Sequence, residues 1–146
     1  MEFLYRLIVY LHVGSAVFSI GPFIILIPIV KKLRAADEKV QQAYLDIIKY
    51  TIRLIKHAGH VLVGSGALLI IMGPWTWKTS WIIATLIVMF GSVLFLARAF
   101  TPTMRIFHES TQNQPALIKN LLRSTWLYLI LLMIMLWFMV AKPVLW

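Results

Sequence analysis

Four apolar stretches, each close to the length of a bilayer crossing, dominate this sequence of 146 residues. They cover about residues 4–30, 57–73, 80–97 and 124–141. A helix needs roughly 20 apolar residues to cross the hydrocarbon core, so each stretch is a candidate transmembrane span. Only 13% of the residues are charged, too few to coat a water-facing globule. The sequence therefore predicts an all-α protein, a single membrane domain (1–146) built as a four-transmembrane-helix bundle.

The second span is preceded by an amphipathic segment over residues 38–56, where apolar residues recur at helical spacing between charged ones. This segment runs into the span without a Gly or Pro, which predicts one long helix stopped by Gly73 and Pro74. The first span has no basic start, so we expect it to be retained rather than cleaved as a signal peptide. A polar loop is expected over 101–113, with the last helix starting near Pro115.

Basic residues are divided unevenly between the two ends of the spans. Eleven Lys and Arg residues lie within 31–56 and 98–123, whereas the opposite side has only Arg6, Lys78 and Lys142. The positive-inside rule then predicts a multi-pass protein of the cell membrane, with both termini outside and those two loops in the cytoplasm. The bilayer is the expected partner, and its anionic headgroups attract such residues. Basic residues that flank spans need no nucleic acid, so we expect none to bind.

Three histidines are the strongest functional candidates among the ionisable residues within these spans. An ionisable group inside a membrane is a functional-site hypothesis by default. Each histidine lies on a stripe of small or polar residues, which either lets two helices approach closely or clears space for a planar ligand. The stripe residues are His12, Ser15 and Ser19 on the first span, and His57, His60 and Gly64 on the second.

The depths of His12 and His60 predict that the two rings face each other. Counted from the outer ends of their helices, they lie roughly 14 and 20 Å deep at 1.5 Å per residue. Two neutral imidazoles from different helices of a bundle can hold a haem iron. We therefore predict haem b bound by His12 and His60, with His57 as a further metal-ligand candidate and Arg6 as a partner for a propionate. Electron transfer or haem handling would follow, with a membrane redox partner or a quinone.

Other interpretations stay open at this point. Histidines also bind copper, so the chain could be a transporter or assembly factor for copper or another small ligand, without haem. The histidines could instead only join helices of a scaffold, and the sequence is compatible with a homo-oligomer. The run Gly64-Ser65-Gly66 indicates helix packing. The chain has no Cys, no HExxH and no phosphate-binding Gly loop, which leaves out the enzyme classes that need them.

A family likeness covers about residues 4–73. It is carried by Leu11-His12-Val13-Gly14-Ser15-Ala16-Val17-Phe18-Ser19-Ile20-Gly21-Pro22, by the basic helix through Arg53-Leu54 and by a small-residue span ending in Gly73. In these features the chain resembles the small four-helix membrane proteins of the copper-resistance CopD and HemJ-type protoporphyrinogen oxidase kind. The resemblance implies that His12 serves haem or copper and adds a porphyrinogen-oxidising enzyme as an alternative. The third span departs from the HemJ-type pattern because it lacks His and Lys, which argues against oxidase chemistry and leaves haem binding in place.

Overall fold

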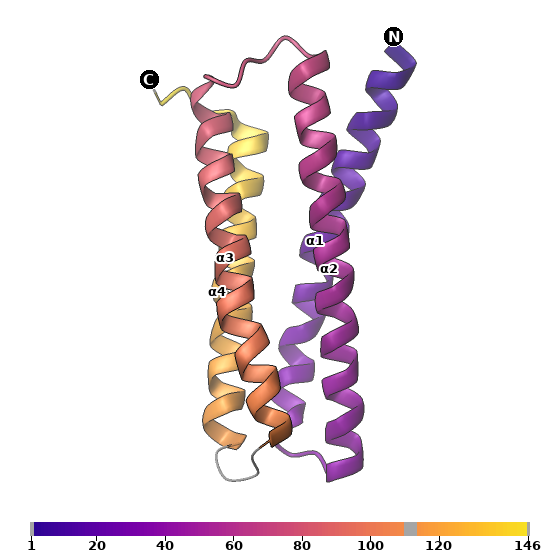
Figure 1. Ribbon diagram of the computed structural model, residues 1–146, viewed down its shortest axis with the longest axis vertical. Coiled ribbons are helices and arrows are strands. Elements are labelled where there is room, and N and C mark those ends of the chain that lie inside the picture. The colour runs from indigo at the N-terminus through magenta and orange to yellow at the C-terminus, as the bar shows by residue number, and fades with distance from the viewer. Residues whose placement is uncertain (1, 110–113, 146) are drawn as a thin grey trace.

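The computed structural model describes residues 2–109 and 114–145, and within them it contains four helices. They are α1 (Glu2–Leu33), α2 (Glu38–Met72), α3 (Ser80–Glu109) and α4 (Gln114–Ala141). The helices form two antiparallel hairpins, α1 with α2 and α3 with α4, and α1 packs on α4 between them (Figure 1). Each contains a segment long and apolar enough to cross a membrane. The predicted all-α, four-span fold is confirmed.

The helix boundaries confirm one prediction and correct another. The amphipathic segment and the second span form one helix of 35 residues, which begins after Asp37 and ends at Gly73. The predicted loop over 101–113 is wrong for most of its length, because α3 continues through Pro102 to Glu109. A proline inside a helix removes one backbone donor and its ring crowds the carbonyl of residue i−4, a disturbance that helices of membrane proteins tolerate, and α3 continues past Pro102. Residues 110–113 lie outside the described part of the chain.

The best-packed core lies toward the end of the bundle opposite the two termini. The ring of Phe23 lies 4.5 Å from that of Tyr128 and 6.0 Å from that of Phe100, measured between centroids. Figure 1 shows the helices close together at this end, whereas the start of α1 leans away from α3 and α4. The fully buried side chains are Phe23, Leu26, Val30, Leu33, Ile48, Ile55, Phe100, Leu121 and Thr125.

Polar contacts join the elements at both ends of the bundle. At the end opposite the termini, Gln41 of α2 and Gln114 of α4 exchange amide hydrogen bonds of 3.2 and 3.5 Å. At the end that carries the termini, the ammonium of Lys142 lies 4.8 Å from the ring centroid of Trp75 and 5.8 Å from that of Trp81. Such cation–π contacts suit the membrane interface, where aromatic rings and basic groups gather. They attach the end of α4 to the loop between α2 and α3.

Two phenylalanines of α1 test whether this core holds the hairpins together. Phe23 is 0% exposed, whereas Phe18 is 60% exposed on the same helix. We expect Phe23→Ala to lower the free energy of unfolding by about 3–5 kcal/mol, because it leaves a cavity where three rings meet. Phe18→Ala should change it far less. Thermal unfolding of the detergent-solubilised variants measures the difference, and equal losses would contradict the packing described here.

Candidate functional site

His12 of α1 is held against α2 through one ring nitrogen. Its Nδ1 lies 3.1 Å from the carbonyl oxygen of Leu62 and 3.1 Å from Oγ of Ser65. A carbonyl oxygen can only accept, so Nδ1 carries the proton and donates it to α2. The hydroxyl of Ser65 in turn donates to the carbonyl of Val61 at 2.6 Å, which leaves its oxygen free to accept from His12. The network therefore assigns the Nδ1–H tautomer to the neutral ring.

A glycine of α2 makes room for this ring. A Cβ atom added to Gly66 would lie 3.1 Å from Cε1 of His12 and 3.5 Å from Nδ1. Such a contact is tighter than ordinary van der Waals packing, so the imidazole lies directly against the α2 backbone. On the other side, Oγ of Ser15 donates to the carbonyl of His12 at 2.8 Å. The ring is thus positioned by Leu62, Ser65 and Gly66 together.

The second ring nitrogen of His12 is left available. Among the residues that the structure describes, Nε2 makes no hydrogen bond, and the side chain is only partly buried. In the Nδ1–H tautomer Nε2 carries the lone pair, which is the atom that a metal ion or a hydrogen-bond donor would meet. Metal-ligating histidines characteristically donate their other N–H to a carbonyl or a similar acceptor. His12 has that arrangement with Leu62.

The two serines of the predicted α1 stripe lie inward of His12 and are both buried. Ser15 uses its hydroxyl on the backbone of His12 itself. Ser19 is 3% exposed, and its Oγ has no partner among the described residues. Because a buried hydroxyl without a partner is costly, Ser19 is a donor and acceptor that water or a bound group can satisfy. It lies seven residues from His12, roughly 10 Å along the helix.

His57 and His60 do not join His12 in this site. Both side chains are exposed. His60 precedes Leu62 by two residues, which turns it about 200° around α2 from the side that faces α1. The expected face-to-face arrangement of His12 and His60 is therefore not found within one chain. The physical reason is the packing of Ile55 and Leu62 on α1, which turns residue 60 outward.

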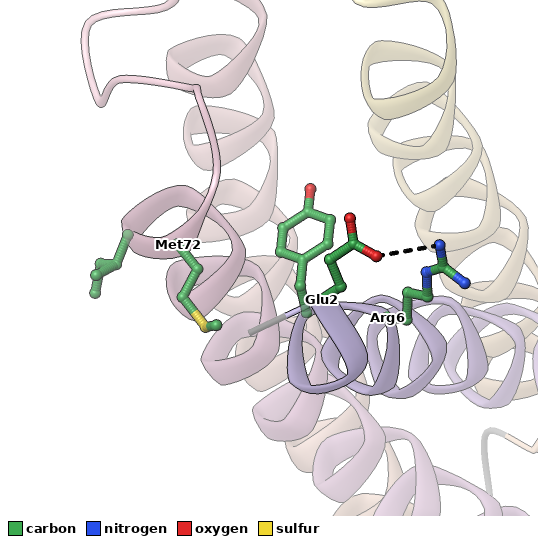
Figure 2. A pocket seen from close by; sticks show the side chains of 5 residues that line it. Glu2, Arg6 and Met72 are labelled. Carbon is green, nitrogen blue, oxygen red and sulfur yellow. Dashed lines mark ion pairs between the residues drawn. The ribbon is translucent and has the colours of Figure 1, made fainter.

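Arg6 lies closer to the N-terminus than His12, where the start of α1 lies beside the end of α2. A pocket of about 510 Å³ there is lined by Glu2, Tyr5, Arg6, Ile71 and Met72. Figure 2 shows the Arg6 guanidinium turned toward the Glu2 carboxylate, with which it forms an ion pair of 3.7 Å. Both side chains are largely exposed, so this pair adds little stability and leaves Arg6 free to meet another anion. Arg6 is six residues from His12, roughly 9 Å along α1.

The small residue predicted for this site was the wrong glycine. Gly64 is exposed, and an added Cβ there would have nothing within 4 Å, whereas Gly66 contacts His12. The structure also adds Leu62 and Ser65, which sequence reasoning did not select. The run Gly64-Ser65-Gly66 carried the signal, because two glycines and a serine in one turn allow close helix approach.

Comparison of the chain with models of known families, with curated proteins and with solved structures found no match. Within the described residues, no three His, Cys, Asp or Glu side chains gather as a metal-ion cluster. A tetrahedral zinc site needs three or four protein ligands, whereas haem brings four nitrogens of its own and needs only one or two.

The two glycines of this turn provide a matched test of the His12 site. Replacement of either by Ala removes a helix-interior glycine, which alone favours the helix by about 1 kcal/mol. Gly66→Ala must also push the His12 ring away, an overpacking cost of about 1–3 kcal/mol. We expect Gly66→Ala to melt below Gly64→Ala in detergent, and the NMR signals of the His12 ring to shift only in Gly66→Ala. Equal effects of both variants would contradict the contact.

Proposed function

We propose that this chain is an integral membrane protein that binds haem b, with His12 as an axial ligand through Nε2. The observation that carries the proposal is the Nδ1 contact with the Leu62 carbonyl, which sets the tautomer and aims the free lone pair. The resemblance to the CopD and HemJ-type proteins, which is drawn from the sequence around His12, implies a role for the same residue.

The surroundings of His12 supply further groups that a haem would use. Bound haem supplies reversible one-electron chemistry, and the chain supplies its orientation and charge environment. Arg6 lies outward of His12 and can pair with a propionate near the membrane surface, and Ser65 keeps the imidazole in its orientation. Electron transfer or haem handling is the proposed use, with a quinone or a membrane redox protein as partner. His60 remains a proposed second ligand, although its side chain lies on a different face of α2 from the one that His12 contacts.

The orientation in the membrane is part of the proposal. Eleven of the 14 basic residues lie within 31–56 and 98–123, and the positive-inside rule predicts that the loops within these segments face the cytoplasm. The haem would then lie nearer the outer face, because His12 belongs to the outer half of α1.

The haem assignment is tested by replacing each histidine in turn. The protein purified with added haemin should show a Soret band and sharpened visible bands on reduction. His12→Ala should lose the band, and added imidazole should restore it, because the free base can take the vacated axial position. Ser65→Ala should retain the band with haem affinity lowered about 10–100-fold, the usual cost of losing an outer-shell partner.

The controls are the exposed histidines of α2. His57→Ala should keep the full spectrum, and His60→Ala should keep the Soret band, with conversion to high-spin iron only if His60 is the second ligand. A His12→Ala variant that retains the unchanged spectrum would sink the assignment. If the unsubstituted protein binds no haem and His12→Ala is merely less stable, the result would support a helix-joining role instead.

The orientation is tested with single cysteines, since the chain has none of its own. Ala35→Cys places a thiol in the loop between α1 and α2, and Lys78→Cys places one in the loop between α2 and α3; both positions are exposed. In intact cells we expect a membrane-impermeant maleimide to label Lys78→Cys and to spare Ala35→Cys until the cells are opened. The reverse pattern would invert the proposed topology.

A further inference from the structure

One side of α2, turned about 100° around the helix from the buried residues that pack on α1, carries a continuous seam of exposed residues at heptad spacing. Its members alternate by three and four residues along the whole helix and, apart from one histidine, are all apolar or aromatic. We call this set the α2 seam. It comprises Val40, Ala43, Ile47, Tyr50, Leu54, His57, Val61, Gly64, Leu68 and Ile71, all exposed. A period of 3.5 residues is the signature of a helix that pairs with another helix along its length.

Lipid alone cannot cover this seam. From Val40 to Ile71 the helix rises roughly 47 Å, against about 30 Å of hydrocarbon in a bilayer. Its first half lies beside charged residues, and there Ile47, Tyr50 and Leu54 are 44%, 70% and 47% exposed. Apart from Phe3 and Leu4, the exposed large apolar residues of α1, by contrast, lie in a stretch without charges from Leu7 to Val30, where acyl chains can cover them. The α2 seam needs a partner as long as itself.

We propose that this partner is α2 of a second copy, packed in parallel about a two-fold axis along the membrane normal. Two copies with the same orientation in the membrane can be related only by a two-fold axis along the membrane normal. This axis places each seam residue opposite the same residue of the second copy. The charges beside the seam allow this pairing: Asp46 and Arg53 flank one side, whereas the positions they would face on the partner are Thr51 and Ala58. No like charges meet across the seam, as parallel helix pairing requires.

The composition of the seam is compatible with a pair. One of the two alternating positions holds the β-branched residues Val40, Ile47 and Val61 together with Leu54 and Leu68, and β-branched residues at that position favour two-stranded coiled coils. His57 is the one histidine of the seam, and a buried polar residue in such a seam can set its register. Gly64 has open space around it within the chain, which allows the two backbones to approach. This pairing is independent of haem and of His12.

The test uses single cysteines in membranes, followed by mild oxidation and non-reducing gels. Seam positions Leu54→Cys and Val61→Cys should shift to twice the monomer mass, because symmetric seam positions bring Cα atoms within disulfide reach. The matched controls are Lys56→Cys and Val63→Cys, two residues farther on and about 200° around the helix. These controls are also exposed and should remain monomeric.

A second variant separates pairing from folding. Gly64→Leu meets nothing within its own chain, so it should leave the thermal stability of the monomer intact while abolishing the Val61→Cys cross-link. Retention of the cross-link in Gly64→Leu would overturn the proposal. So would equal cross-linking on both faces, cross-linking confined to Lys56→Cys and Val63→Cys, or none at any position. The haem spectrum of His12 variants has no bearing on these outcomes.

Discussion

The antiparallel contact between α1 and α2 is the interaction on which both proposals depend. Ile48, Ile55 and Leu62 are buried along one line of α2, and they fix how that helix is turned about its own axis. With this rotation set, Ser65 and Gly66 must face α1, where His12 meets them. The same rotation sends His57 and His60 to the opposite side. One packing choice therefore creates the candidate ligand site and exposes the seam.

The side chains that pack the bundle differ between its two halves. Phe23, Phe100 and Tyr128 close the centre, and Leu26, Val30 and Leu33 continue the core inward. Outward of this core the α1–α2 contact becomes small and polar, through Ser15, His12, Ser65 and Gly66. Residues of this kind give up dispersion contacts that larger apolar side chains would make. A helix pair that needed only stability would gain by filling this region.

The sequence was sufficient to predict the four-helix architecture, because long apolar stretches such as these satisfy their own backbone hydrogen bonds in lipid only as helices. Every backbone donor and acceptor must be satisfied within the segment, so a stretch such as 80–97 becomes a helix. The single long α2 also followed, since nothing between residues 38 and 72 interrupts it apart from isolated glycines. The continuation of α3 past Pro102 did not follow, because a proline beside polar residues indicates a turn in most settings.

The partners of His12 were harder to predict, and the reason is physical. Between residues 61 and 72, α2 is apolar or small on every side, so no charged face marks which direction points to lipid. Gly64 and Gly66 look alike in the sequence, yet they lie about 200° apart on the helix. The depth of each residue along α2 can be estimated from its distance to the helix end, and this estimate places His60 at nearly the level of Leu62. The rotation of α2 about its own axis cannot be estimated in this way, because only the packing of α1 on Ile55 and Leu62 determines it.

An exposed imidazole at the depth of His60 raises the question of what a membrane protein gains from it. Lys49, Arg53 and Lys56 precede it on the same side of α2, so His60 is the last member of a polar stripe that reaches inward from the headgroups. Long basic side chains there can extend back to the interface, but a histidine is too short to do so. His60 must find a partner near its own position. The α2 seam lies directly beside it, so a second copy would shield His60 from lipid as well as cover the apolar residues.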